Sequence, residues 1–117
     1  MKGIRTLNLD DNSIGDGGVF YIAQMRGIQE LHLACNNIGN SGAMFIAQMQ
    51  GVNTLFLHGN SIGDVGTLEI AQMKGLGVLD ISYNALDDTG IQQIVQMREH
   101  TNLNLIVDPQ QLYHCFY

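Results

Sequence analysis

A segment of 24 residues repeats along the chain without insertion. Successive copies begin at Met1, Met25, Met49 and Met73, and a fifth copy, which begins at Met97, is degenerate. A repeat this short cannot enclose a hydrophobic core of its own, so each copy must bury its apolar residues against its neighbours. The period therefore predicts a solenoid in which consecutive copies stack.

The first half of each copy has the pattern of a short strand. Three apolar positions recur with the spacing i, i+3 and i+5, and the last two lie on one face of an extended segment. Every copy then has an asparagine, whose amide can donate to and accept from backbone groups left unpaired where the strand turns away. These residues are Asn12, Asn36, Asn60 and Asn84.

The second half of each copy has the pattern of a short helix. An isoleucine and a methionine three residues apart predict an inward stripe, as with Ile46 and Met49. Glycines stand where a residue with positive φ ends the preceding helix: Gly3, Gly27, Gly51 and Gly75. Polar residues stand where each helix should have its own N-cap: Asp16, Asn40, Asp64 and Asp88.

The pattern LxxLxLxxNxIxxxG, which ends at Gly42 in the second copy, resembles the leucine-rich repeat in a short, ribonuclease-inhibitor-like form. The resemblance implies an α/β fold: a right-handed βα solenoid with a parallel concave sheet, convex helices and ligands bound on the sheet. It covers residues 1–108, as four repeats and a degenerate fifth with Leu103 and Leu105 as its strand leucines. Residues 109–117 are expected to form either an improvised cap or a frayed tail.

The first strand has no helical repeat before it, because Met1, Lys2 and Gly3 correspond to the end of a helix. Terminal repeats need a polar outer face to remain soluble. We therefore expect either that the chain is part of a longer array or that it self-associates through the uncapped N-terminal repeat.

The charge balance of five basic against eleven acidic residues disfavours nucleic acids and anionic membranes as partners. No apolar run has the length of a secretory signal or a membrane span. Cys35 and Cys115 lie far apart in the sequence and are predicted to be free thiols in a reducing compartment. A cytoplasmic protein is the resulting expectation.

Outward-facing strand residues should form ladders across the sheet, because adjacent parallel strands lie about 4.8 Å apart. We expect Asn104 beside Asp80 in the middle ladder. Four acids have no structural role that the repeat explains: Asp10, Asp11, Glu30 and Asp80. The sequence predicts an acidic and aromatic surface that binds a basic protein or peptide, and the alternative is a solvated polar sheet face. The predicted partner-binding residues are Asp10, Glu30, His32, Phe56, His58, Asp80 and Tyr83.

An enzyme is not expected, because the sequence has no glycine-rich phosphate loop, HExxH motif or nucleophile elbow. No metal site or cofactor is expected either, since His32, His58 and Asp80 stand on different ladders or are separated by Phe56. The predicted function is a protein–protein interaction module. The alternative is a fragment of a larger leucine-rich repeat receptor, ligase adaptor or GTPase regulator. The repeats also resemble arrays in bacterial effectors, which implies delivery into a host cytosol.

Overall fold

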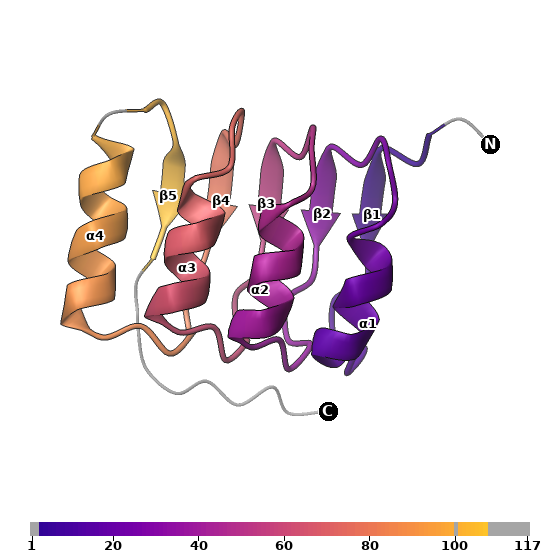
Figure 1. Cartoon of the computed structure of the whole chain (residues 1–117), viewed down its shortest axis with the longest axis horizontal. Coiled ribbons are helices and arrows are strands. Elements are labelled where there is room, and N and C mark those ends of the chain that lie inside the picture. The colour runs from indigo at the N-terminus through magenta and orange to yellow at the C-terminus, as the bar shows by residue number, and fades with distance from the viewer. Residues whose placement is uncertain (1–2, 100, 108–117) are drawn as a thin grey trace.

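The computed structural model describes residues 3–99 and 101–107. In this part of the chain, five parallel strands form one sheet in sequential order and four helices cover one side of it (Figure 1). The row of helices extends farther than the row of strands, so the stack bends with the sheet on its inner side. The elements are β1 (Thr6–Asn8), α1 (Gly15–Ile22), β2 (Glu30–His32), α2 (Asn40–Ala47), β3 (Thr54–Phe56), α3 (Asp64–Ala71), β4 (Val78–Asp80), α4 (Asp88–Arg98) and β5 (Asn104–Ile106).

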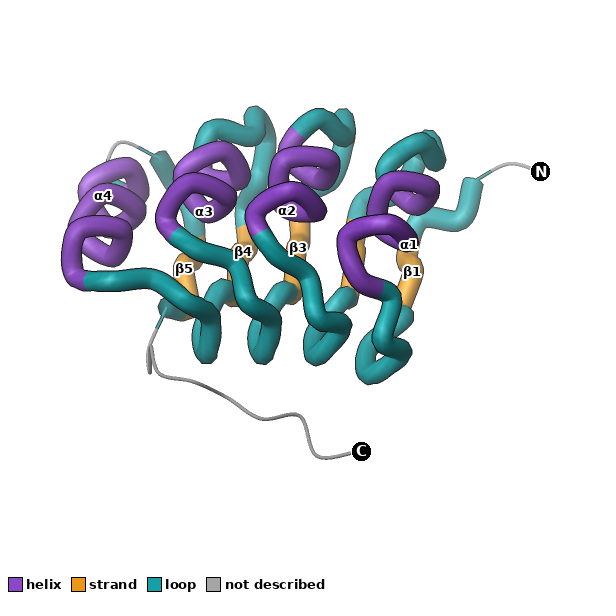
Figure 2. Tube along the Cα trace, turned by 60° about the horizontal axis from the view of Figure 1, so that its bottom comes forward, coloured by secondary structure: helices purple, strands orange, loops and turns teal. Residues whose placement is uncertain are grey.

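The strands and helices lie in two layers joined by turns (Figure 2), which confirms the predicted right-handed βα solenoid. The core runs between the layers as a ladder of equivalent side chains. Leu31, Leu55 and Leu79 are paired in register and fully buried. None of the helices in the described residues is long and apolar enough to cross a membrane.

The first three helices are shorter than the inward stripe of the sequence suggests, whereas α4 includes both Ile94 and Met97. Ile46 is fully buried as predicted, but α1 and α2 end at Ile22 and Ala47, so the methionines lie in the following turns. Met25 is 37% exposed, whereas Met49 is buried. The predicted positive φ is confirmed at Gly3, Gly27, Gly51 and Gly75. The prediction that these glycines end the helices is wrong, because α1, α2 and α3 end several residues earlier and the glycines lie in the turns that follow.

The predicted asparagine ladder is present, and the side-chain amides of Asn36, Asn60 and Asn84 each join two repeats. Asn60 Oδ1 accepts hydrogen bonds from the amides of Asn36 and Ile38, at 2.9 and 3.0 Å. Its Nδ2 donates to the carbonyls of Leu33 and Leu57, at 3.0 and 2.9 Å. Because the side chain is buried, these bonds satisfy backbone groups that water does not reach.

The predicted N-caps are wrong for all four helices. Asp88 is the first residue of α4, and the preceding residue, Asp87, is the cap that accepts a hydrogen bond from the amide of Gly90. Asn40 and Asp64 are the first residues of their helices rather than the residues before them. Their side chains, and that of Asp16, reach the N-terminus of the next helix instead. Asp16 Oδ1 accepts from the amides of Gly39 and Gly42 in the second repeat, at 2.8 and 3.0 Å. For α2 and α3, capping is therefore a contact between repeats.

The register predicted for the fifth repeat is wrong by two residues. Helix α4 has 11 residues, whereas α3 has 8. As a result Ile106, not Asn104, pairs with Asp80, and Leu105 lies opposite Leu79. Residues 109–117, predicted to form a cap or a frayed tail, lie outside the described residues.

Cys35 is disulfide-bonded, so the prediction of a free thiol is wrong for this residue. Spacing along the sequence does not limit which thiols a fold brings within bonding distance. Cys115 lies outside the described residues. The expectation of a reducing compartment, which rested on free thiols, loses that support.

Candidate functional site: the outer face of the sheet

The sheet face consists of the outward side chains of β1–β5 and the turn residues that directly follow each strand. Its centre is an aromatic pair. The register places His32, Phe56 and Asp80 side by side on neighbouring strands. The rings of His32 and Phe56 stack with their centroids 4.5 Å apart and their planes at 28°. The predicted neighbourhood of these three residues is confirmed.

A carboxylate holds the imidazole of this pair. Glu30 Oε2 lies 2.7 Å from His32 Nε2, on the same strand two residues away. The His32 side chain is 22% exposed and that of Glu30 41% exposed, so the carboxylate remains accessible to a partner. Glu30 therefore fixes the orientation of the ring that supports Phe56.

A second histidine–carboxylate pair lies beside the first. His58 Nδ1 is 3.4 Å from Asp80 Oδ2, an ion-pair distance, although the atoms lack hydrogen-bond geometry. Asp80 Oδ1 also accepts hydrogen bonds from the hydroxyl and the amide of Ser82, at 2.6 and 3.0 Å. The Asp80 side chain is only 15% exposed, so its neighbours and the two hydrogen bonds from Ser82 hold the carboxylate in one orientation.

These contacts shift the ionisation of both partners. The contact with Asp80 raises the pKa of His58, and the charges of Asp80, Asp10 and Asp11 add to this effect while burial opposes it. Burial raises the pKa of Asp80, but the interactions with His58 and Ser82 outweigh it and bring that pKa below its usual value. The protonated imidazole and the ionised carboxylate therefore stabilise each other.

The view that the four acids have no structural role is wrong for three of them. Asp10 Oδ1 accepts a hydrogen bond of 2.7 Å from the amide of Ala34 in the next repeat. Asp80 is bonded to Ser82, and Glu30 to His32. Each carboxylate is held by the fold and still contributes negative charge to the sheet face.

Tyr83 lies in a turn whose backbone conformation the sequence did not indicate. It has a φ of 55°, and the equivalent residues of the other repeats, Asp11, Cys35 and Gly59, have φ values of 62°, 56° and 72°. A left-handed conformation costs a non-glycine residue about 1–2 kcal/mol. Gly59 is the only residue at this position whose type indicates a positive φ. The other repeats adopt the same backbone conformation with Asp11, Cys35 and Tyr83.

Five of the seven predicted residues form one connected group: Glu30, His32, Phe56, His58 and Asp80. Asp10 reaches the group through its charge, which acts on His58. Within the described residues, the sheet face carries four carboxylates and no lysine or arginine. No group of three or more His, Cys, Asp or Glu side chains in this part of the chain could hold a metal ion.

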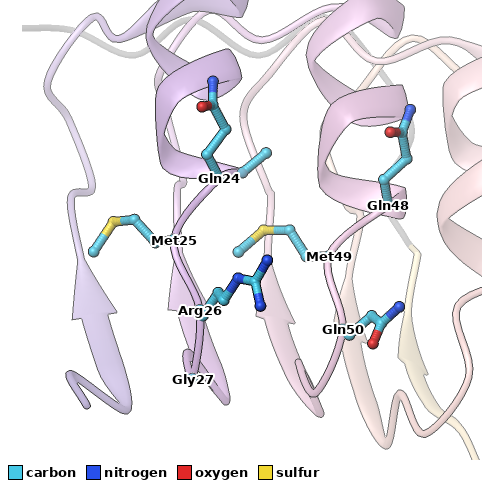
Figure 3. Close-up of a pocket in the computed structure, with 8 residues that line it drawn as sticks. Gln24, Met25, Arg26, Gly27, Gln48, Met49 and Gln50 are labelled. Atoms are coloured by element: carbon cyan, nitrogen blue, oxygen red, sulfur yellow. The ribbon is translucent and has the colours of Figure 1, made fainter. Parts of the chain in front are cut away.

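Two hollows among the described residues lie away from the sheet face. One, of about 720 Å³, lies between the turns that follow α1 and α2 and is lined by Met25, Arg26 and Met49 (Figure 3). A similar hollow of about 690 Å³ is lined by Met73, Lys74 and other residues at the ends of α3 and α4. Since they recur at equivalent positions, these hollows are a product of the repeat.

A sequence profile described as "Leucine Rich repeat" matches residues 4–23, 26–47 and 76–95, which together make up more than half of the chain. No curated protein matches the chain. Leucine-rich repeat arrays are in general protein-interaction modules with extended binding surfaces. From its repeats, its five-stranded parallel sheet and this profile match, the chain belongs to the leucine-rich repeat family.

Proposed function

We propose that this protein binds a basic segment of a partner protein through the sheet face, with Phe56 as the anchor. The observation that carries the proposal is the stacked pair of His32 and Phe56, which lies between the carboxylates of Glu30 and Asp80. Phe56 is half-buried, and the accessible face of an aromatic ring in an electronegative setting attracts the guanidinium or ammonium group of a partner.

The carboxylates of this surface are already in position. Asp80 is held by Ser82 and Asp10 by the amide of Ala34, so neither side chain needs to be ordered when a partner binds. Less loss of side-chain entropy leaves more of the Coulomb attraction as affinity. The Phe56 ring is packed on one side by His32, which restricts its motion in the same way.

A second proposal is that the repeats belong to a larger leucine-rich repeat receptor, ligase adaptor or GTPase regulator. The exposed apolar residues at the N-terminal end of the stack support it, since Ile4 is 43% exposed. The two proposals are compatible, because the sheet face and the end of the stack are different surfaces.

The test is binding to an array of short peptides, one half rich in Lys and Arg and the other rich in Asp and Glu, at physiological salt. We expect binding to basic peptides only. Phe56→Ala should weaken it by about tenfold or more, equivalent to about 1.4 kcal/mol. Phe20→Ala is the matched control, because Phe20 is exposed on the helix layer.

A charge-matched pair separates specific from general attraction. Glu30→Gln should weaken binding more than Glu69→Gln. The second substitution removes the same charge from Glu69, which is exposed on α3 and lies away from the sheet face. Equal binding by the Phe56→Ala variant and the unaltered protein, or a preference for acidic peptides, would refute the proposal.

A further inference from the structure

The helix layer carries a row of exposed apolar side chains that runs across three neighbouring helices. Phe20 of α1 and Met44 of α2 occupy the same position of the repeat and are 45% and 42% exposed. Leu68 stands at this position in α3 and is half-buried, and Val65, one turn before it, is 61% exposed. We call these four residues the helix row.

The fold does not require apolar residues at these positions. In α4 the residue equivalent to Leu68 is Gln92 and the residue equivalent to Val65 is Thr89, and both are exposed. The helix row therefore ends at α3, although the repeat continues through α4. Neighbouring apolar side chains that remain exposed without a structural need mark an interaction site.

One end of the helix row is already held in place. The ring of Phe20 packs edge-on against Tyr21 in its own helix and against Phe45 of α2, with ring centroids 5.3 Å apart in both pairs. A side chain that its neighbours restrict loses little entropy when a partner covers it. Phe20 is therefore suited to act as an anchor for a partner.

The other end of the helix row opens into a hollow between α3 and α4. This hollow has a volume of about 290 Å³ and is lined by Leu68, Met97, Gln93 and Gln96. Leu68 and Met97 give it an apolar surface, and the two glutamines give it a polar rim. An apolar side chain of a partner can enter it without burying a charge of this protein.

Charges of opposite sign lie along the two edges of the helix layer. The helices are parallel, so their N-terminal ends share one edge and their C-terminal ends share the other (Figure 1). No ion pair within the described residues involves any charged side chain of these edges. The N-terminal edge has Asp16, Asp64, Asp87 and Asp88, and the C-terminal edge has Arg26, Lys74 and Arg98.

Two of these cations line hollows of the C-terminal edge. Arg26 is the cation of the hollow of about 720 Å³ between the turns that follow α1 and α2 (Figure 3), and Lys74 is that of the hollow of about 690 Å³. An acidic side chain that enters a hollow is less screened by solvent than one on a flat surface. The C-terminal edge is thus complementary to carboxylates of a partner, and the N-terminal edge to cations.

The spacing of the helix row matches that of a helical partner. Packed helices lie about 8–10 Å apart, so successive members of the row recur at about this distance. Seven residues of an α-helix rise about 10.5 Å and return to the same face. Three residues of a strand rise about 10 Å, but alternate contact residues then lie on opposite faces.

We infer that the helix row binds an amphipathic helix of a partner protein, with an apolar residue at about every seventh position and opposite charges on its two flanks. The acidic flank of that helix lies over Arg26 and Lys74, and the basic flank lies over Asp87 and Asp88. This surface is distinct from the sheet face, so the inference does not rest on the binding of a basic segment there.

The test is a titration with a labelled helical peptide of about 21 residues, with leucine at every seventh position, glutamate on one flank and lysine on the other. We expect saturable binding, with amide shifts in the NMR spectrum at Phe20, Met44 and Leu68. Met44→Gln should weaken binding at least about fivefold. It leaves the fold intact because Met44 is exposed, which a thermal melt verifies. Phe56→Ala, on the sheet face, is the matched control and should leave the affinity unchanged.

The charges are tested separately from the apolar contact. Lys74→Gln should weaken binding, and Lys74→Arg, which keeps the charge, should not. A peptide of the same composition in scrambled order should bind much more weakly, because its leucines no longer share a face.

Four results would overturn the inference. In the first two, Met44→Gln or the scrambled peptide binds as well as its unaltered counterpart. In the third, a proline-rich peptide with leucine at every third position binds more tightly, because a polyproline helix also returns to one face at about 9.3 Å. In the fourth, sedimentation shows a dimer that Met44→Gln abolishes, which would assign the helix row to a second copy of this chain.

Discussion

The side chain of Asp16 in α1 accepts a hydrogen bond from the amide of Gly42 in α2, with a nitrogen–oxygen distance of 3.0 Å. This contact explains why Gly42 has no side chain. A Cβ there would lie 2.5 Å from Asp16 Oδ1 and 2.7 Å from Ile38 Cγ2. Asn40 approaches Gly66 in the same way. The capping oxygen of one repeat therefore requires a glycine at the contact position in the next repeat.

Gly42→Ala should therefore destabilise the protein by about 1–3 kcal/mol, because the added methyl group overfills a packed contact. Urea unfolding followed by circular dichroism measures the change. Gly17→Ala is the matched control: it is exposed in α1, and nothing lies within 4 Å of the point where a Cβ would stand. That substitution should stabilise by about 0.5–1 kcal/mol, since alanine favours the helix. Equal effects would contradict the packing account.

Asn60→Ala should destabilise strongly, by about 3 kcal/mol or more, because it leaves several buried backbone groups unsatisfied at about 1–3 kcal/mol each. Asn60 is 7% exposed and bonds to two repeats. Asn12→Ala should cost much less, since Asn12 is exposed at the end of the ladder. The ratio of the two losses in chemical denaturation is the readout, and similar losses would show that the ladder contributes little.

Asp64→Asn should raise the unfolding midpoint at pH 7. Partial desolvation and the neighbouring Asp87 raise the pKa of Asp64 above 3.8, so its ionised form is disfavoured in the folded state. Stability from a raised carboxyl pKa is present at low pH and is lost as the pH rises through the folded value. Asparagine keeps the oxygen that accepts from the Asp87 amide, as Asn40 does for Gly63.

The advantage of Asp64→Asn should disappear below pH 3.8, where Asp64 is itself protonated. Thermal melts of both proteins across this range provide the check. An advantage that persists unchanged at acidic pH would show that charge is not its cause.

The pair of His58 and Asp80 should stabilise the fold most between pH 3.8 and 6.5. The raised pKa of His58 gives stability that is present below 6.5 and is lost as the pH rises through the folded value. The lowered pKa of Asp80 gives stability that is present above 3.8 and is lost as the pH falls.

An NMR titration should place the pKa of His58 above 6.5, and Asp80→Asn should lower it. The difference in unfolding free energy between the protein and His58→Asn should shrink above neutral pH. A His58 resonance that titrates at or below the usual value would contradict the pairing.

Repetition made the solenoid, its buried leucines and the asparagine ladder predictable, because the same residue type recurs wherever the same contact recurs. The capping partner was not predictable in this way. The position of Asp16 shows only that it lies near a helix start, and which helix it caps depends on the spacing of two repeats in space. The register of β5 was predicted wrongly because Leu103 and Leu105 both fit the strand pattern. The longer α4 places Leu105 opposite Leu79.

In the candidate site, the sequence predicted which residues lie side by side on neighbouring strands but not which side chains bond to one another. The adjacency of His32, Phe56 and Asp80 follows from the period alone. The pairing of His32 with Glu30 and of Asp80 with Ser82 depends on side-chain rotamers, which no spacing reports. The disulfide of Cys35 depends on the folded path of the chain rather than on spacing, and the positive φ at Tyr83 is indicated only by Gly59 at the equivalent position of the third repeat.

The most direct test of the account is an NMR titration of the labelled protein with the tightest-binding basic peptide from the array. We predict that the amide shifts gather on the strands at His32, Phe56, His58 and Asp80, while the helix residues Phe20, Met44 and Glu69 stay unchanged. Shifts that gather on the helices, or that spread evenly over the surface, would contradict the claim that the sheet face binds the partner.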